Sequence, residues 1–376
     1  MEKKNQIPKY PHLRFPEFTD EWKEVTLGEV LSFETGYPFS SDAFNEEGNG
    51  VRLIKNRDLK ADDRVVFYGG EYDAQYIVQN GDILIGMDGD FSPCLWKKGR
   101  ALLNQRVGRV NVNRNTSRVF ILYVLIDSLK KVELKTSSTT VKHLSHKDVE
   151  KIKASLPSFP EQRKIAALLS LIDERIEVQN AIIKEQEVAK TSLIRRLFDR
   201  TLRFPEFTDE WKEVKLGEVV ICYSSTMTEE ELQKEGGIPI YGAAGCCGYA
   251  DVDEPFLESI LIIKDGSGVG RSQYVTGPHY FLGTLNSLRT TSPTIFQKFV
   301  FYFLGQLNLK KYVCGSGIPH IYFSDYSKAS CFLPSLPEQR KIADLLSAVD
   351  ERITVEKEYA TLLQKQKAYL LRQMFV

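Results

Sequence analysis

The 376-residue chain has no apolar run long enough to cross a bilayer as a helix, which takes about 20 residues. Its first six residues, MEKKNQ, are charged or polar and lead into no apolar segment, so we expect no secretory signal. These absences predict a cytoplasmic protein that does not associate with membranes.

Cysteine is scarce, and the six cysteines show no C-x-x-C spacing and no nearby pair of histidines. We therefore expect neither a metal site nor a disulfide framework, and we interpret the thiols as buried or idle. The five histidines form no ligand set such as H-E-x-x-H, although His143 and His146 are close in sequence.

Signatures of catalysis are also missing. The glycine-rich segment 265–271, DGSGVGR, lacks the G-K-[ST] ending of a phosphate-binding loop and does not fit G-x-G-x-x-G. We interpret it as a flexible turn close to a ligand backbone. The chain contains no G-x-S-x-G elbow and no acidic cluster convincing enough for a nuclease. The sequence thus predicts no active site, no cofactor and no metal in this chain.

The net charge is zero, because 50 Lys and Arg residues balance 50 Asp and Glu residues. A neutral chain argues weakly against nucleic acid, since phosphate binding depends on basic side chains. The distribution is uneven, however: residues 97–118 hold seven basic side chains and no acid, and residues 266–324 hold five and no acid. Such stretches favour surfaces that contact phosphate.

What the chain does contain is an internal repeat. Residues 13–25, LRFPEFTDEWKEV, return unchanged as residues 202–214. Residues 156–166, LPSFPEQRKIA, return as residues 333–343 with only Phe159 exchanged for Leu336. We call the first repeat the opening motif and the second the closing motif. Each half of the chain is therefore an opening motif, an insert and a closing motif.

The two inserts, residues 26–155 and 215–332, differ in length by 12 residues and show no convincing similarity. One frame around two unlike inserts predicts one architecture with two specificities. The alternative is a duplication whose inserts drifted without a functional reason.

Each closing motif predicts the start of a long helix. Ser158 and Ser335 stand three residues before Glu161 and Glu338, which is the spacing of a capping box. Downstream residues follow the 4-3 spacing of a coiled coil over a helix roughly 55 Å long. The seam positions that we assign to the coiled coil and to partner binding are Ile165, Leu169, Ile172, Ile176, Ile342, Leu346, Val349 and Ile353.

The opening motif returns directly after the first helix, so the chain must reverse its direction. We expect the two helices to pair antiparallel, with the inserts at opposite ends in approximate two-fold symmetry. The alternative is that each helix associates with another copy of the chain.

Both inserts show short β-like runs separated by Gly and Asn turns, followed by one helical stretch, which predicts an α+β class. In insert one, strands are expected at 51–54, 64–68, 82–85 and 107–112, and a helix at 119–134. In insert two, strands are expected at 238–241, 259–263 and 274–275, and a helix at 293–309.

Loops between these strands carry side chains suited to base edges and phosphates, because Arg recognises guanine and Asn or Gln recognises adenine through paired donors and acceptors. The candidate DNA contacts of insert one are Lys55, Asn56, Arg57, Lys97, Lys98, Arg100, Asn104, Gln105 and Arg106. Those of insert two are Tyr241, Lys264, Ser267, Arg271, Gln273, Asn286, His320 and Tyr322. The alternative for each is an ordinary surface residue.

The closing motif, followed by Asp350-Glu351-Arg352-Ile353 and copied at residues 156–176, resembles the conserved regions of the specificity (S) subunit of type I restriction-modification systems. The resemblance covers nearly the whole chain. It implies target-recognition domains at 1–155 and 201–332, and conserved coiled-coil regions at 156–200 and 333–376.

The resemblance also implies that each recognition domain reads one half of a bipartite site on double-stranded DNA. The helices would set the spacing between the halves and dock two methyltransferase (M) subunits, which restriction and translocase (R) subunits join. S-adenosylmethionine, ATP and magnesium would belong to those partners, and this chain would be non-catalytic. The family has no fixed contact positions, so the contact residues above rest on charge alone.

Two other classes of function remain open at this stage. One is an autonomous DNA-processing enzyme such as a nuclease, which metal-dependent cleavage by the purified chain would favour. The other is a coiled-coil interaction protein without a DNA role. Charge reversal at Lys97, Arg100, Lys264 and Arg271 without effect on activity would favour that second class.

Overall fold

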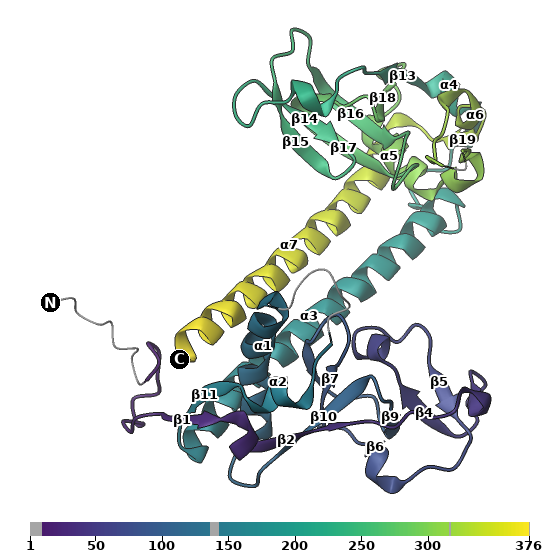
Figure 1. Cartoon of the computed structure of the whole chain (residues 1–376). Coiled ribbons are helices and arrows are strands. Elements are labelled where there is room, and N and C mark those ends of the chain that lie inside the picture. Colours follow the sequence, from purple (N-terminus) through teal and green to yellow (C-terminus); the bar gives the residue numbers. More distant parts are fainter. Residues whose placement is uncertain (1–9, 136–142, 316, 376) are drawn as a thin grey trace, which may run out of the picture. The chain divides into compact units, whose positions relative to one another are not determined.

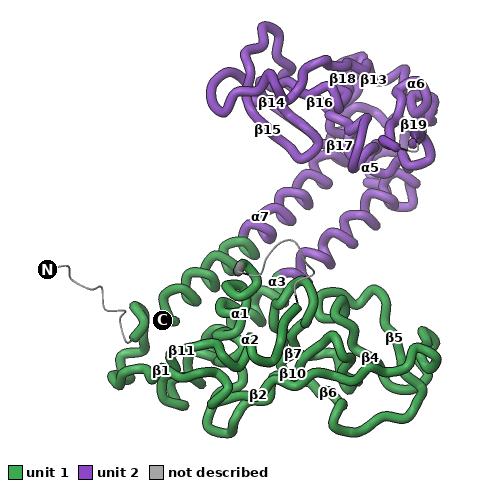
Figure 2. Tube along the Cα trace, in the orientation of Figure 1, with its two compact units in different colours: residues 1–179, 359–376 green, residues 180–358 purple. Residues whose placement is uncertain are grey.

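A computed structural model describes residues 10–135, 143–315 and 317–375 of the chain. The first six residues, to which the prediction about a secretory signal applies, lie outside this range. Figure 2 shows two compact units, unit 1 with residues 1–179 and 359–376 and unit 2 with residues 180–358. Each unit thus combines one insert with parts of both long helices.

Unit 1 is centred on an antiparallel sheet with the strand order β2-β10-β7-β8 (Figure 1). Ile83 and Val110 of this sheet share one hydrophobic core with Phe120 and Leu125 of helix α1. The bounds are β2 (Leu31–Thr35), β7 (Ile83–Gly86), β8 (Pro93–Leu95), β10 (Val107–Val112) and α1 (Arg118–Lys135).

A second sheet of unit 1, with the order β3-β5-β4-β9-β6, has a core of its own around Leu53, Tyr68 and Leu102. Its strands are β3 (Phe44–Asn45), β4 (Val51–Ile54), β5 (Val66–Tyr68), β6 (Ile77–Val78) and β9 (Ala101–Leu103). The short helix η3 (Asn56–Leu59) follows β4 and carries predicted contact residues.

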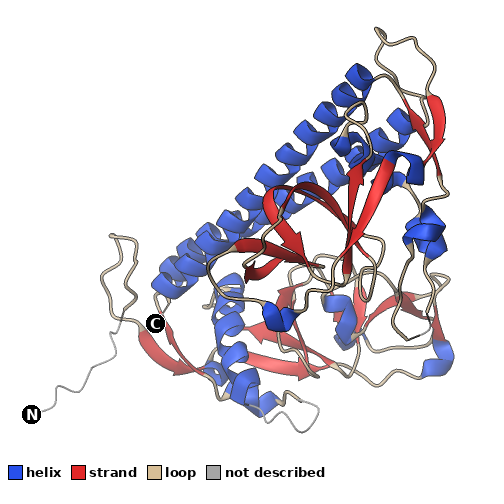
Figure 3. Cartoon of the chain, turned by 90° about the horizontal axis from the view of Figure 1, so that it is seen from above, coloured by secondary structure: helices blue, strands red, loops and turns tan. Residues whose placement is uncertain are grey.

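Unit 2 has one larger sheet with the order β13-β18-β16-β17-β14-β15. Ile260 and Leu288 pack with Val300 and Leu304 of helix α5, as the unit 1 sheet packs with α1. The bounds are β13 (Val220–Ser224), β14 (Ile238–Gly242), β15 (Gly245–Ala250), β16 (Phe256–Ile263), β17 (Ser272–Phe281), β18 (Leu285–Thr290) and α5 (Gln297–Gln306). Figure 3 shows the mixture of helices and strands that the α+β prediction requires, so that prediction is confirmed.

Many predicted elements appear with nearly the expected bounds. The strands at 51–54 and 107–112 are β4 and β10, and the helix at 119–134 is α1. The strand expected at 274–275 lies in the first half of the much longer β17, in which the exposed residues Thr276, Gly277 and Pro278 interrupt the apolar pattern. The helix expected at 293–309 is the shorter α5.

In each unit, the end of the opening motif pairs antiparallel with a strand that leads from the insert into the first residue of the closing motif. In unit 1, β1 (Lys23–Thr26) pairs with β11 (Lys153–Leu156). In unit 2, β12 (Lys212–Lys215) pairs with β19 (Ser330–Leu333). The repeated sequence therefore closes each insert into a loop with a common base.

The glutamate of the closing motif anchors the opening motif. Both oxygens of Glu161, which is 1% exposed, accept hydrogen bonds from Arg14 at 2.7 Å, and Trp22 Nε1 lies 3.4 Å from one of them. Glu338 holds Arg203 in the same way, at 2.8 and 2.9 Å. The two carboxylates thus make long-range anchors, in place of the local capping boxes that their spacing predicted.

Gln162, the residue after Glu161, connects the closing motif to α1, the helix of insert one. Gln162 Oε1 accepts a hydrogen bond from the backbone N–H of Ser117, just before α1, and its amide donates to the carbonyl of Pro157. Gln339 makes the equivalent bonds before α5, at 2.8 Å from the N–H of Phe296. One buried side chain thus satisfies the backbone of two segments, which explains the repeated Glu-Gln pair.

The long helices α3 (Phe159–Phe198) and α7 (Leu336–Met374) confirm the predicted helical regions. Ile165 and Leu169 are at most 1% exposed in the core of unit 1, and Ile342 and Leu346 are equally buried in unit 2. Ile172 and Ile353 are also buried, whereas Ile176 and Val349 are partly exposed. This chain itself therefore covers most of the seam, and partner binding by these residues stays a prediction.

Polar contacts show the direction of the helices inside each unit. In unit 1, Asp173 of α3 forms an ion pair with Lys367 of α7 at 2.5 Å, and Arg175 donates to the hydroxyl of Tyr359 at 2.8 Å. Residue numbers rise along one helix as they fall along the other, so the segments run antiparallel. In unit 2 the antiparallel partners are Glu187 with Lys357 and Lys190 with Asp350.

Across residues 10–135, 143–315 and 317–375, no helix is both long and apolar enough to cross a membrane. Within the same ranges, no three His, Cys, Asp or Glu side chains gather as ligands of a metal ion. The cysteines are free thiols, and burial raises the pKa of Cys331 to about 12.

Candidate nucleic-acid interface

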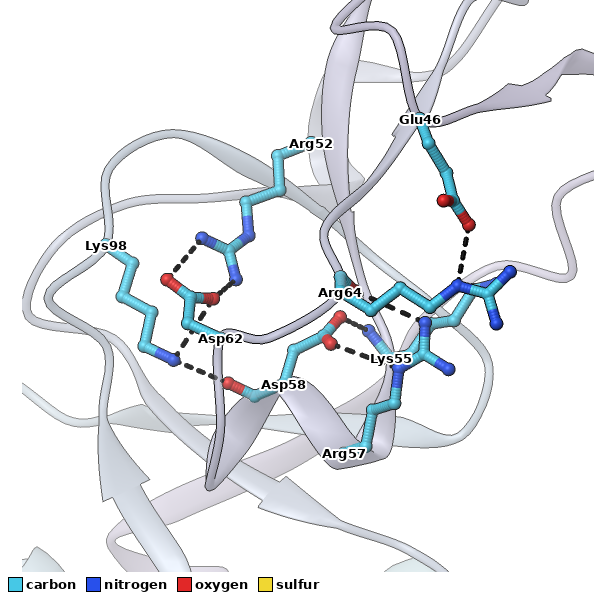
Figure 4. Close-up of polar contacts among 8 residues, drawn as sticks. All are labelled: Glu46, Arg52, Lys55, Arg57, Asp58, Asp62, Arg64 and Lys98. Carbon is cyan, nitrogen blue, oxygen red and sulfur yellow. Dashed lines mark hydrogen bonds and ion pairs between the residues drawn. The ribbon is translucent and has the colours of Figure 1, made fainter. Parts of the chain in front are cut away.

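In unit 1, a polar cluster surrounds η3 and joins several predicted contact residues (Figure 4). Asp58 is 1% exposed and accepts a hydrogen bond from the backbone N–H of Lys55 at 2.7 Å. Lys98 Nζ donates to the carbonyl of Asp58 at 2.8 Å and lies 3.4 Å from Asp62. Arg57 reaches Asp58 at 3.5 Å and remains partly exposed. The backbone of η3 is therefore fixed while its outer side chains face solvent.

Acidic residues from outside the basic stretch 97–118 compensate much of its charge. The ion pairs are Lys97–Glu177 at 2.6 Å, Lys98–Asp62 at 3.4 Å, Arg106–Asp88 at 3.1 Å, Arg109–Glu34 at 2.9 Å and Arg118–Asp82 at 3.4 Å. The Arg109 guanidinium lowers the pKa of Glu34, so that pair stays charged at neutral pH. The linear pattern therefore overstated the free positive charge of unit 1.

Most of these pairs are solvent-exposed, which limits what they contribute to stability. Exposed ion pairs are worth about 0–1 kcal/mol, because water screens them and two long side chains must be ordered. A phosphate could replace such a carboxylate partner at little cost. The pairs therefore hold the basic side chains in place and leave them available to bind phosphate.

Three basic residues of the stretch 266–324, Arg289, Lys298 and Lys311, contact aromatic rings instead. Lys298 lies over Tyr274 at 5.7 Å, and Lys311 lies over Tyr312 at 4.8 Å. In the part of the chain that the structure describes, none of the basic residues between 266 and 324 forms an ion pair with a carboxylate. Unit 2 therefore offers the less compensated positive charge.

Five predicted contact residues of unit 2 come together at the end of β16. Lys264, Ser267 and Arg271 belong to the turn after this strand. His320 and Tyr322 lie against it, because the N–H of Ile321 between them donates to the carbonyl of Lys264 at 2.9 Å. The rings of His320 and Tyr322 are 4.8 Å apart, and Tyr322 is 55% exposed.

Three predicted residues of insert two lie elsewhere in the sheet. Gln273 on β17 donates to the carbonyl of Gly242 at 2.9 Å, and the ring of Tyr241 packs against His279 at 5.9 Å. Asn286 is only 4% exposed and accepts a hydrogen bond from the hydroxyl of Ser224 at 3.0 Å. Asn286 does not fit the prediction of a DNA contact, because β18 places its side chain inside the unit.

In unit 1, Asn104, Gln105 and Arg106 form the turn between β9 and β10. The N–H of Gln105 donates to the carbonyl of Tyr37, and Asn104 Oδ1 accepts from the N–H of Arg106 at 3.3 Å. Arg100 is exposed and donates to the hydroxyl of Tyr72 at 3.2 Å. This turn and η3 both lie beside the end of β7.

Asp88, just after β7, and His143, which is bridged to it, were not among the DNA contacts predicted from the sequence. Asp88 accepts hydrogen bonds from Arg106, and His143 Nδ1 lies 2.9 Å from one of its oxygens. A signal for them exists in the sequence. Asp88 precedes His143 by 55 residues, as Asp265 precedes His320, and both histidines stand equally far before the closing motif.

The sequence profile of the family described as type I restriction modification DNA specificity domain matches residues 19–187 and again residues 208–364. The specificity subunit of the type I restriction enzyme EcoBI from Escherichia coli is 32% identical over 167 residues, covering 44% of this chain and 35% of that protein. The MjaVIII specificity subunit from Methanocaldococcus jannaschii is 23% identical, covering 96% of this chain and 92% of that protein. The match therefore spans about a third of the E. coli relative and nearly all of the archaeal one.

Solved structures show the same fold at low identity. A crystal structure of the S subunit of a type I restriction-modification system from M. genitalium superposes with a TM-score of 0.68 at 19% identity, covering 98% of this chain and 99% of that chain. A chain from work on complex assembly and conformational transition of the type I restriction-modification system gives a TM-score of 0.53 at 18% identity, covering 94% and 97%.

Proposed function

The chain belongs to the family of type I restriction-modification DNA specificity subunits, and on this basis we propose that it selects the DNA sequence on which a type I complex acts. Unit 1 reads one half of a bipartite site on double-stranded DNA, and unit 2 reads the other. The observation that carries this proposal is the duplicated frame: both halves match the family profile, and each frame holds a different insert.

The insert surfaces support DNA as the ligand. At η3, unit 1 presents basic and amide side chains, and at the end of β16, unit 2 presents basic, hydroxyl and imidazole side chains. Buried neighbours fix the backbone of both turns. Fixed backbone with exposed polar ends is what base-edge recognition requires, because a donor must be aimed as well as available.

The outer faces of the helices support docking of two methyltransferase (M) subunits, with restriction (R) subunits joining that core. In unit 1, Leu171 and Val178 of α3 are 59% and 60% exposed, and Leu362 and Tyr369 of α7 are 61% and 54% exposed. Each pair is seven residues apart, so its members share a face of their helix. Exposed apolar side chains repeated along a face are typical of protein interfaces.

The chemistry of the complex belongs to those partners in this proposal. S-adenosylmethionine, ATP and magnesium would be bound by the methyltransferase and restriction subunits, and this chain would contribute specificity from the cytoplasm. Its helices would set the unread gap between the two half-sites.

Exchange of insert two, residues 215–332, for the insert of a related protein tests the function. Sequencing of methylated adenines across the genome should show one half-site changed and the other intact. Exchange of insert one, residues 26–155, is the matched control and should change the other half. A methylation motif that survives both exchanges, or that persists when the gene is deleted, would refute the proposal.

A further inference from the structure

The same backbone arrangement occurs at the end of a central strand in both units. β7 is followed by Met87-Asp88-Gly89 and β16 by Lys264-Asp265-Gly266, and both glycines have positive φ, 78° and 84°. An isolated antiparallel bridge then joins Asp88 to His143 and Asp265 to His320. We define each group as an Asp-Gly/His element.

We propose that the two Asp-Gly/His elements are the equivalent base-reading points of the two units, and that Asp88 is the positioning residue that aims Arg106 and His143 at DNA. This inference rests on the proposed function and adds to it where on each unit the specificity lies.

Backbone hydrogen bonds fix both elements. In unit 1, the N–H of Leu144 donates to the carbonyl of Met87 at 2.8 Å, and Met87 and Leu144 are both buried. In unit 2, Ile321 is buried, its N–H donates to Lys264, and the N–H of Gly266 donates to the carbonyl of Pro319 at 2.8 Å. The bridged histidines therefore sit on rigid backbone rather than on a free loop.

In unit 1, one carboxylate organises two donors. Arg106 Nη1 lies 3.1 and 3.3 Å from the oxygens of Asp88, and His143 Nδ1 lies 2.9 Å from one of them. The side chains of Arg106 and His143 are 58% and 52% exposed, against 24% for Asp88. The carboxylate thus lies deeper than the donors, which extend past it into solvent.

In this arrangement, Arg106 and His143 keep hydrogen-bonding groups that can contact base edges. A guanidinium has five N–H donors, so Arg106 can hold Asp88 and still present donors to a guanine edge. When Nδ1 of His143 donates to this carboxylate, Nε2 is the ring nitrogen left for contact with a base edge.

Asn56 belongs to the same element. Its amide Nδ2 donates to the carbonyl of Asp88 at 2.7 Å. It packs so closely on Gly86 that a Cβ at position 86 would lie 1.9 Å from its Oδ1. Asn56 can therefore pack against the end of β7 only because Gly86 has no side chain.

Unit 2 keeps the backbone and changes the side chains. His320 exchanges two hydrogen bonds with the backbone of Cys314, both at 2.9 Å. Its Nδ1 lies 3.3 Å from the carbonyl of Ile318, and its ring contacts Tyr322. A histidine beside a tyrosine and Lys264 offers another donor pattern than a histidine beside an arginine, as two different half-sites require.

The test uses the full chain in its native host, with genome-wide sequencing of methylated adenines. Asp88→Asn should relax base preference in one half of the motif by about tenfold or more, the discrimination of one good bidentate contact such as Arg106 can make. His143→Ala should relax base preference in the same half. His320→Ala should relax the other half, so each histidine variant controls for the other. Lys153→Ala removes an exposed ion pair with Glu24 of the opening motif, on β11 at the end of insert one, and should change neither half.

Measurement of both thermal stability and base preference distinguishes a positioning role of Asp88 from a role in folding. Asp88→Asn keeps the shape of the side chain, so its thermal unfolding midpoint should match the unchanged protein while its half-site preference falls. Preference intact in every variant would overturn the inference, as would equal relaxation of both halves by either histidine variant. Methylation unchanged on deletion of the gene would instead sink the proposed function itself.

Discussion

A hydroxyl on the insert helix of unit 2 ties that helix to both frame helices. Tyr302 of α5 donates to Asp350 Oδ2 of α7 at 2.8 Å, and Lys190 of α3 forms an ion pair with the same carboxylate. Tyr302 is 3% exposed, and burial raises the pKa of its phenol, so it remains a donor through neutral pH. Tyr302→Phe keeps the ring and removes this hydrogen bond, together with the longer contact of 3.3 Å between the same hydroxyl and Ser347 Oγ.

The size of the effect follows from the environment of the carboxylate. Hydrogen bonds to charged groups contribute about 1.5–3 kcal/mol. The side chain of Asp350 is 34% exposed and keeps Lys190, so the lower end, about 1.5 kcal/mol, applies. For a unit of this size, that loss lowers the unfolding midpoint by about 3–6 °C. Lys190→Ala should cost less, about 0–1 kcal/mol, because the ion pair is partly solvated.

Urea unfolding of the purified chain, followed by far-UV circular dichroism, measures these losses. Tyr369→Phe is the matched control, since that tyrosine is 54% exposed on α7 and its hydroxyl should be worth less than about 0.5 kcal/mol. A loss below about 0.5 kcal/mol for Tyr302→Phe, or a larger loss for Lys190→Ala, would refute the reasoning.

Unit 1 repeats the arrangement with residues from equivalent elements. Tyr123 of α1 donates to Asp173 Oδ2 of α3 at 2.8 Å, and Lys367 of α7 pairs with that carboxylate at 2.5 Å. Tyr123→Phe should therefore destabilise unit 1 by the same amount as Tyr302→Phe destabilises unit 2. The aspartate is the first residue of the Asp-Glu-Arg-Ile sequence that follows both closing motifs, and this network explains its place there.

Three further outcomes are expected. Gly86→Ala should displace Asn56, because the new Cβ would overlap its Oδ1, and should weaken base preference in one half of the methylation motif. Leu346→Ala, at a fully buried seam position, should cost about 2–5 kcal/mol in the same unfolding assay. Burial lowers the pKa of His279, so the unfolded chain binds its proton more readily. Stability should therefore fall as pH drops from about 6.5 through the folded pKa, and less steeply in His279→Gln, measured by urea titrations at stepped pH.

The sequence was most informative where local pattern and tertiary role coincide. The 4-3 spacing identified the buried seam of α3 and α7, and alternating or continuous apolar runs located β4, β10 and β14. These features depend on periodicity, which a single sequence displays directly. The repeat likewise identified the frame, although the roles of Glu161 and Gln162 needed the structure, because their partners are distant in sequence.

Charge was the weaker guide to the site. An acid-free stretch reports neighbours along the chain, whereas ion pairs form between neighbours in space, and Glu177 reaches Lys97 from 80 residues away. Asn286 was misplaced for a similar reason, since nothing in its local sequence distinguishes a buried amide from an exposed one. The candidate contact set therefore remains a prediction, narrowed by the structure to the turns beside β7 and β16.

The position of the length difference between the inserts bears on how specificity can change. From Asp88 to the closing motif, unit 1 has as many residues as unit 2 has from Asp265, so the 12-residue difference lies entirely upstream. That upstream part forms most of the sheet β3-β5-β4-β9-β6 in unit 1 and the β14-β15 hairpin in unit 2. The contacts of Glu161, Gln162 and their copies lie outside it. Substitution there can therefore alter a reading surface without disturbing the frame, whereas the downstream part must keep its length to bring His143 or His320 back to its strand.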